Sequence, residues 1–293
     1  MLSILIPTYN YNIAPLVNEL QEQCNLIPEL QYEVIVYDDG SDLFHSENSQ
    51  INKLLNCSYT ILEKNIGRSA IRNLLAKNAS FENLIFLDAD VRIISENFIA
   101  TYLNHIKNNP DYEVVYGGIV YQKEQPNNNQ LLRWTYGNDR EALNASERQK
   151  NPYLAFLTLN FLIKKNVFTK VSFNENIPNL RYEDLLFSHD LMLEKINIAH
   201  INNQVVHNGI ETSEVFLEKT NSSLHGLKYL LDNKNIDYNY ARISRVYSKN
   251  KNTLFIIRIF YRLLNKLLIK NLLGAKPSLF VYDIYRLGYL SNI

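Results

Sequence analysis

Short apolar runs alternate with helix-like segments along the N-terminal third of this chain. Four apolar runs are short enough to be strands, at residues 2–6, 33–37, 59–62 and 84–87. Three segments between them carry apolar residues at helical spacing, at residues 14–24, 49–55 and 68–77. Parallel strands need helical crossovers of this kind, so the alternation predicts an α/β fold with a mostly parallel sheet.

The later part of the chain continues this pattern and then becomes helical. Further elements are predicted as a helix at 95–108, a strand from 113 past Gly117 and Gly118 to Tyr121, ordered structure at 154–163 and a last strand at 204–207. Residues 122–150 are polar and contain Pro126, so they predict a long loop with a short helix. We expect a sheet domain at 1–212 and a helical extension at 213–293.

A helix predicted at 253–273 is apolar around most of its circumference and carries a row of basic residues. They recur at every fourth position, at Arg258, Arg262, Lys266 and Lys270. Such a helix can lie on the inner face of an anionic membrane, as a peripheral contact with its apolar face down. Alternatively, it packs on the sheet domain or on a second copy of the chain in a homodimer. Both alternatives stay open, with packing favoured.

The charge balance and the cysteines exclude several classes of protein. The 293 residues include 30 Lys and Arg and 30 Asp and Glu, so no net positive charge favours a nucleic-acid partner. Cys24 and Cys57 lack the spacing of a metal site or a disulfide framework, which favours a reducing cytoplasm. No uncharged apolar run reaches about 18 residues, so no membrane-spanning helix is expected. The first apolar run ends at Pro7 and is typical of a strand rather than of a secretory signal.

Two carboxylates one residue apart follow the apolar run at 84–87. Asp88 and Asp90 lie where that strand ends, and buried carboxylates are costly unless a positive group compensates them. Oxygen ligands suit a hard divalent cation such as Mg²⁺ or Mn²⁺, which would in turn hold phosphates. Open α/β sheets also bind ligands at the carboxyl ends of their strands. The pair alone also fits an ordinary strand exit, so the neighbouring strand ends decide the matter.

Polar residues also follow the first two strands and open the third helix. The first strand runs into residues 7–10, and the second ends at Asp38 and Asp39. Asp39 can accept a hydrogen bond from a base imide. Arg68 and Arg72 lie four residues apart on one helix face and can meet a diphosphate. We expect all of these groups to meet at one edge of the sheet.

Together, these motifs resemble the family 2 glycosyltransferases of the GT-A fold. The resemblance rests on Pro7-Thr8-Tyr9-Asn10, Asp38-Asp39-Gly40-Ser41, Asn65-Ile66-Gly67 with Arg72-Asn73, Leu87-Asp88-Ala89-Asp90, Asn160-Phe161-Leu162-Ile163, Tyr182-Glu183-Asp184 and His207. It implies a GT-A domain, a twisted and mostly parallel sheet between helices. It also implies an inverting transfer of a hexose-type sugar from a nucleotide-diphosphate donor, with a UDP-sugar favoured, to a glycan or lipid-linked acceptor. The implied setting is bacterial surface-polysaccharide assembly, with Mn²⁺ or Mg²⁺ as cofactor.

The same resemblance implies roles for individual residues. Donor contacts fall to Pro7, Thr8, Tyr9, Asp38, Asp39, Asn65, Arg68, Arg72 and Asp88. Asp90 is the expected metal ligand, and Asp88 and His207 are further candidates. Asp184 is the expected general base for the acceptor hydroxyl, and Glu183 orients the acceptor or the base. Asn160 and Trp134 are expected on the acceptor side.

Simpler interpretations of these residues exist. Asp184 and Glu183 also suit the start of a helix, where carboxylates are favoured by the helix dipole. His207 also fits a histidine with ordinary hydrogen bonds. Trp134 ends a Q-x-x-R-W sequence, a signature of processive polysaccharide synthases, but it lies about fifty residues before Asp184 instead of after it. We therefore expect Trp134 in a loop or helix over the active site, as a candidate for stacking on an acceptor sugar.

Rival functions are weaker or need a functional test. A sugar-1-phosphate nucleotidyltransferase would need a glycine-rich basic loop after the first strand, and residues 7–10 do not form one. A Rossmann dehydrogenase would need G-x-G-x-x-G after a strand, which this sequence lacks. A non-catalytic subunit that binds a nucleotide sugar stays open, because only turnover of the donor distinguishes it from an enzyme.

Overall fold

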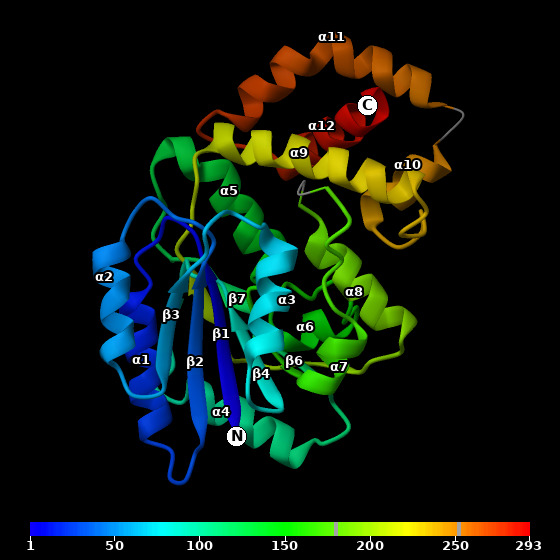
Figure 1. Ribbon diagram of the computed structural model, residues 1–293. Coiled ribbons are helices and arrows are strands. Elements are labelled where there is room, and N and C mark those ends of the chain that lie inside the picture. Colours follow the sequence, from blue (N-terminus) through cyan, green and yellow to red (C-terminus); the bar gives the residue numbers. More distant parts are fainter. Residues whose placement is uncertain (179–180, 251–252) are drawn as a thin grey trace. The chain divides into compact units, whose positions relative to one another are not determined.

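The computed structural model describes residues 1–178, 181–250 and 253–293, which form two compact units (Figure 1). The sheet unit comprises Met1–Val120, Leu143–Ile177 and Glu183–Gly209. The helical unit comprises Tyr121–Ala142, Pro178–Tyr182 and Ile210–Ile293. Each unit is therefore assembled from three segments of the chain. The division into domains at 1–212 and 213–293 stays a prediction.

A seven-stranded sheet forms the centre of the sheet unit and confirms the predicted α/β class. Its strands are β1 (Leu2–Thr8), β2 (Tyr32–Asp38), β3 (Cys57–Ile61), β4 (Asn83–Leu87), β6 (Val114–Tyr116), β8 (Asn160–Lys164) and β9 (Ile198–His200). They lie in the order β3-β2-β1-β4-β8-β6-β9. The first four of these are parallel, whereas β8 runs antiparallel to β4 and β6. The four N-terminal strands are confirmed.

Helices of the sheet unit connect these strands (Figure 1). They are α1 (Ala14–Asn25), α2 (His45–Ser49), α3 (Arg68–Asn78), α4 (Phe98–Asn108), α6 (Ala145–Gln149), α7 (Lys165–Lys170) and α8 (Glu183–Leu193). The helix predicted at 49–55 is shifted towards the N-terminus, because α2 ends at Ser49 and a 3₁₀ turn at Gln50–Lys53 follows it. The right-handed βαβ connections bring the carboxyl ends of β1, β2 and β4 to one edge.

Alternate side chains of the central strands fill two layers of core. Leu5 of β1 and Phe86 of β4 belong to a cluster with apolar residues of α3, α7 and α8. Their neighbours Ile4 and Ile85 are equally buried and point to the opposite face, because side chains alternate along a strand. Strands that are buried on both faces are nearly continuous apolar runs, which is how β1 and β4 stand out in the sequence.

Stacked phenylalanines fix α8 against this sheet. Phe187 of α8 stacks on Phe173 with ring centroids 4.2 Å apart, and its centroid lies 6.2 Å from that of Phe161 in β8. Phe161 in turn stacks on Phe86 of β4 at 5.0 Å. These rings tie the first turns of α8 to the strand that precedes Asp88.

The single strand predicted from 113 to 121 is wrong, because the chain turns at Gly117 and Gly118. β6 lies in the main sheet, whereas β7 (Ile119–Val120) joins a second sheet with β5 (Val91–Ile93) and β10 (Val205–His207). Gly118 adopts φ 93°, in the left-handed region that favours glycine. The second sheet pairs β10 antiparallel to β5 and sets His207 opposite Val91, directly after Asp90.

Residues 122–150 hold more regular structure than the predicted long loop. They form a 3₁₀ turn (Asn128–Gln130), α5 (Leu131–Tyr136), a π-helical turn (Gly137–Glu141) and α6. Arg133 is buried, and its guanidinium lies 3.0 Å from Glu141 and donates to the Tyr121 hydroxyl at 2.6 Å. A polar sequence can conceal such a buried network, because its charges are paired inside the protein.

The helical unit confirms the helices expected near the C-terminus. Besides α5 it contains α9 (Ser213–Asp232), α10 (Arg242–Lys249), α11 (Leu254–Leu272) and α12 (Leu279–Asn292). Its core gathers Phe216 of α9, Leu272 of α11 and Tyr282 of α12. Within the part of the chain that the structure describes, every helix is too short or too polar to cross a membrane.

Asn160 of β8 holds the turn at Gly117 and Gly118. It is fully buried, and its amide nitrogen donates to the carbonyl oxygens of Gly118 and Asn203, each at 2.9 Å. Its amide oxygen accepts a hydrogen bond of 2.8 Å from Tyr102. The expected acceptor contact of Asn160 stays a prediction. The structure shows this side chain joining the two sheets.

Replacing Asn160 with alanine should lower the free energy of unfolding by about 3 kcal/mol, because it removes three buried hydrogen bonds, those to the carbonyls of Gly118 and Asn203 and that from the Tyr102 hydroxyl. Urea denaturation measures this loss. Asn104, an exposed asparagine of α4, provides the matched alanine variant, with an expected change under about 0.5 kcal/mol. Equal losses in the two variants would contradict the scaffold role of Asn160.

Candidate active site

The ends of β1 and β2 are locked together by hydrogen bonds. The Asp39 amide donates to the Thr8 carbonyl at 2.9 Å, and the Asn10 amide donates to the Ser41 hydroxyl at 2.7 Å. Asp38 is fully buried and accepts from the Ser41 amide at 2.8 Å and from the Tyr59 hydroxyl at 2.5 Å. Both carboxylate oxygens of Asp38 are thus used to hold the turn after β2.

Asp39 fixes the chain that leads into α3. Its two carboxylate oxygens accept from the backbone amides of Ile66 and Gly67, at 2.7 and 3.1 Å. Gly40 approaches the backbone so closely that an added Cβ would lie 3.0 Å from the amide nitrogen of Asn65. Each Asp39 oxygen keeps lone-pair capacity for one more donor, because a carboxylate oxygen can accept two hydrogen bonds.

A buried hydroxyl lies beside this locked turn. Thr8 Oγ1 has no hydrogen-bond partner among residues 1–178, 181–250 and 253–293, although Thr8 is almost fully buried. Tyr9 is exposed over half of its surface, Pro7 is partly buried, and Asn65 is exposed. Buried polar groups normally find a partner, so the Thr8 hydroxyl marks a place where a ligand group can bind.

Arg72 and Asp88 form an ion pair at the end of β4. Arg72 Nη2 lies 2.7 Å from Asp88 Oδ1, and its guanidinium stacks over Phe173 at 5.4 Å from the ring centroid. Burial alone would lower the pKa of Arg72, but the negative charges of Asp88, Glu183 and Asp184 raise it above its ordinary value. Arg72 is therefore a permanent buried cation among carboxylates. Its expected contact with a diphosphate stays a prediction.

The acidic pair Glu183 and Asp184 forms the first turn of α8 and lies near the same cation. Glu183 contacts Arg68, with Oε1 and Nη1 3.3 Å apart, and the Leu185 amide donates to Asp184 at 2.8 Å. Burial, followed by the charge of Glu183, raises the pKa of Asp184 to about 6. The Leu185 amide, Arg72 and Arg68 act in the opposite direction. A carboxylate with this pKa is ionised at neutral pH and is a stronger base than an ordinary aspartate.

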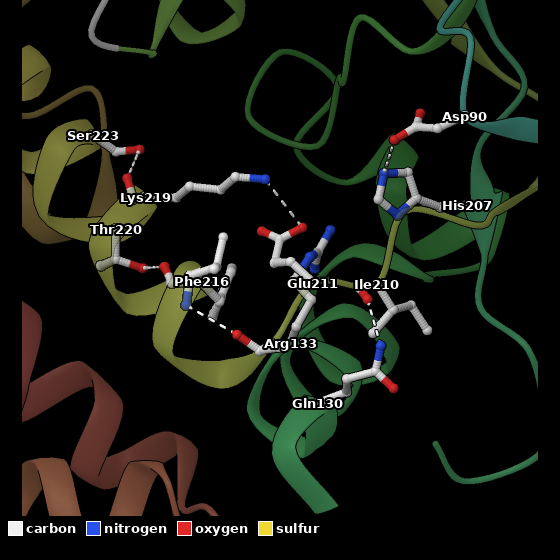
Figure 2. Close-up of polar contacts among 12 residues, drawn as sticks. Asp90, Gln130, Arg133, His207, Ile210, Glu211, Phe216, Lys219, Thr220 and Ser223 are labelled. Atoms are coloured by element: carbon white, nitrogen blue, oxygen red, sulfur yellow. Dashed lines mark hydrogen bonds and ion pairs between the residues drawn. The ribbon is translucent and has the colours of Figure 1, made fainter. Parts of the chain in front are cut away.

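The second sheet places His207 against Asp90 (Figure 2). His207 Nε2 lies 3.4 Å from Asp90 Oδ2, and Gly209 lies so close that an added Cβ would collide with the Asp90 carboxylate. Neighbouring ligand atoms around an octahedral cation lie about 3 Å apart, given metal–oxygen distances near 2.1 Å. Asp90 and His207 therefore fit one divalent cation between them.

Asp88 is ion-paired with Arg72 through Oδ1, and its role as a metal ligand stays a prediction. No cluster of three His, Cys, Asp or Glu side chains suited to a metal occurs within the described ranges. Magnesium-like cations commonly take one or two protein ligands and complete their shell with water and substrate phosphates. Asp90 and His207 thus suit a cation that binds together with a phosphorylated ligand.

The structure brings most of the predicted site residues together in the sheet unit. Trp134 belongs to the helical unit, where its indole nitrogen donates to the Gln122 carbonyl at 3.0 Å. Phe173, Gly209 and Tyr11 also lie at this site and were not predicted from the sequence. Burial, followed by the charge of Asp90, raises the pKa of Tyr11. The signal for Gly209 was weak but present, because it is one of nine glycines and follows the strand that ends at His207.

The fold and these strand ends define an α/β protein of the GT-A class. A profile described as Glycosyl transferase family 2 matches residues 3–174, more than half of the sequence. The chain belongs to this family. A search of curated proteins finds no significant match.

Solved structures agree with this fold. TarS 1–349 of S. aureus is 21% identical, with a TM-score of 0.54 over 77% of this chain and 65% of that one. The mannosyltransferase PcManGT of Pyrobaculum calidifontis, in complex with GDP-Man and Mn²⁺, is 15% identical, with a TM-score of 0.56 over 79% and 64%. A further TarS 1–349 structure, in complex with UDP-GlcNAc, has a TM-score of 0.52 at 21% identity, over 77% and 66%. The match spans just under two thirds of these three chains.

Replacing Gly209 with alanine should displace the Asp90 carboxylate and raise the dissociation constant for Mn²⁺ at least about tenfold when a nucleoside diphosphate is present. Electron paramagnetic resonance of free Mn²⁺ measures the change. Asn208→Ala alters the exposed neighbouring side chain and should leave Mn²⁺ binding unchanged. If Gly209→Ala bound Mn²⁺ as tightly as the wild type, Asp90 would not hold the cation.

Proposed function

We propose that this protein is an inverting, metal-dependent glycosyltransferase of the hexosyl type. It would move a sugar from a nucleotide-diphosphate donor, with UDP favoured, to a glycan or lipid-linked acceptor in bacterial surface-polysaccharide assembly. Family membership and a GT-A fold shared with structures that carry UDP-GlcNAc and GDP-Man support the donor class. The site residues support the chemistry.

The observation that carries the proposal is the electrostatic link between the end of β4 and the start of α8. Arg72 contacts Asp88, and its charge also acts on Glu183 and Asp184. One cation therefore connects the expected donor side with the expected base. A mere helix cap at Asp184 would not require a buried cation shared with the strand end.

Asp184 is the residue that we assign as general base. The acceptor hydroxyl oxygen attacks the anomeric carbon on the face opposite the diphosphate, and the bond to the diphosphate breaks with its electron pair. The hydroxyl proton passes to a carboxylate oxygen of Asp184. Glu183 keeps Asp184 basic, since its charge raises the pKa of Asp184.

The donor would bind at the ends of β1, β2 and β4. The Thr8 hydroxyl and the remaining lone pairs of Asp39 are placed for a nucleobase, and Arg72 orients Asp88 for the rest of the donor. A divalent cation held by Asp90 and His207 would neutralise charge that develops on the leaving diphosphate. Asp38 also holds the turn after β2, and we keep both Asp38 and Asn65 among the proposed donor-binding residues.

We place the protein in the cytoplasm. Cys24 and Cys57 are free thiols, which suits a reducing compartment. Burial raises the pKa of Cys24 to about 12 and that of Cys57 to about 11, so both stay protonated and unreactive at neutral pH.

Asp184→Asn should lower kcat at least about 100-fold while the affinity for the donor nucleotide stays nearly unchanged. The folded state should not lose stability above pH 6. Folding raises the pKa of Asp184, so protonated Asp184 stabilises the folded state at low pH. This stabilisation is lost as the pH rises through about 6, and the ionised carboxylate then contributes nothing that asparagine would remove. Release of nucleoside diphosphate and thermal melting measure the two effects. Retained turnover with a lowered melting temperature would make Asp184 a helix cap instead.

The pH profile provides a second check on the base. The value of kcat/KM for the acceptor should rise with pH through an apparent pKa near 6, because Asp184 must be ionised to take the proton. Glu183→Gln should move this rise to lower pH, because it removes the charge that raises the pKa of Asp184 and leaves Arg68 and Arg72 in place. An identical profile in the two proteins would contradict the coupling between Glu183 and Asp184.

A further inference from the structure

One face of α11 exposes large apolar side chains along its length. Seven of them have between 38% and 75% of their surface exposed, namely Phe255, Ile256, Ile259, Phe260, Leu263, Leu264 and Leu267. The opposite face of α11 packs on α12, where Tyr261 and Leu272 join the core of the helical unit (Figure 1). At 100° per residue the seven exposed positions cover about half of the circumference. Exposed apolar patches of this extent mark a binding surface.

The chain around this face is strongly basic although the whole protein has no net charge. Residues 238–282 contain no Asp or Glu. They contain nine basic residues, Arg242, Arg245, Lys249, Lys251, Arg258, Arg262, Lys266, Lys270 and Lys276. Elsewhere acidic residues therefore exceed basic ones. The charge is thus concentrated around the helix that exposes its apolar face.

The basic residues of α11 run beside the apolar face. Arg258, Arg262, Lys266 and Lys270 are all exposed and recur at every fourth position, so they form a row that drifts slowly around the helix. Arg258 donates to the Ser291 carbonyl and Arg262 donates to the Asn292 side chain, both at the end of α12. The first half of the row is thereby anchored at the edge of the α11–α12 contact.

An apolar face with a cationic border fits an anionic lipid surface better than a second copy of this chain. Two copies paired through α11 would bring two basic rows together, and α11 offers no acidic residue to compensate them. Anionic headgroups provide the missing negative charge, and the acyl region accepts the apolar side chains. We propose that α11 lies flat on an anionic membrane surface and anchors the protein there reversibly. This goes beyond the proposed function and does not depend on it.

Vesicle sedimentation tests the proposal with the full chain. At low salt the wild type should sediment with vesicles of phosphatidylcholine mixed with phosphatidylglycerol, much less with phosphatidylcholine alone, and less again as salt screens the charges. Leu263→Gln with Leu267→Gln should abolish sedimentation, because these two residues are the most exposed on the apolar face, at 75% and 63%. Matched controls are Leu26→Gln with Leu55→Gln, two exposed leucines of the sheet unit.

A charge variant separates headgroup binding from apolar adsorption. Lys266→Glu with Lys270→Glu should weaken binding to the anionic vesicles at least about 25-fold, since each basic residue is worth about fivefold at such a surface. Lys77→Glu with Lys107→Glu, two exposed lysines of α3 and α4, should change binding far less. Melting temperatures of all variants should match the wild type.

Wild-type protein that stays in the supernatant with both vesicle types would overturn the proposal. The proposal would also be overturned if the wild type did not bind vesicles but formed a dimer in light scattering, and if Leu263→Gln with Leu267→Gln dissociated that dimer.

Discussion

The contact between Arg72 and Asp88 is the interaction on which the site depends. Carboxylates at the ends of buried strands are costly unless a positive charge or hydrogen-bond donors compensate them. Arg72 supplies that charge from a buried position, and its field reaches Glu183 and Asp184 as well. Asp39 fixes the start of α3 and hence the place from which Arg72 extends. Folding of this edge and the basicity of Asp184 are therefore set by the same charges.

Strands and helices could be predicted from the sequence where the pattern of apolar residues within one segment determines them. Apolar runs predicted β1, β2, β3 and β4, most clearly β1 and β4, which are buried on both faces. Helical spacing of apolar residues predicted α1, α3 and α4. Prediction failed where partners are distant in the chain. The turn at Gly118 is held by Asn160, and the buried network of Arg133 depends on Tyr121 and Glu141. Neither partnership can be inferred from composition or spacing.

The candidate site shows the same division. Resemblance to a family selected Asp90 and His207, but the structure gives the physical reason they meet, which is the antiparallel pairing of β10 with β5. Asp88 and Asp90 have identical chemistry in the sequence, yet one is bound to Arg72 and the other lies beside His207. Only a three-dimensional arrangement separates a charge-paired carboxylate from one suited to a metal.

A crystal structure with UDP and Mn²⁺, recorded at a wavelength where manganese scatters anomalously, tests the central claim most directly. The account predicts an anomalous peak about 2.1 Å from Asp90 and His207. It also predicts diphosphate oxygens in the same coordination shell and the nucleobase beside Thr8 and Asp39. A nucleotide bound away from the carboxyl ends of β1, β2 and β4, or a manganese peak that touches neither Asp90 nor His207, would contradict it.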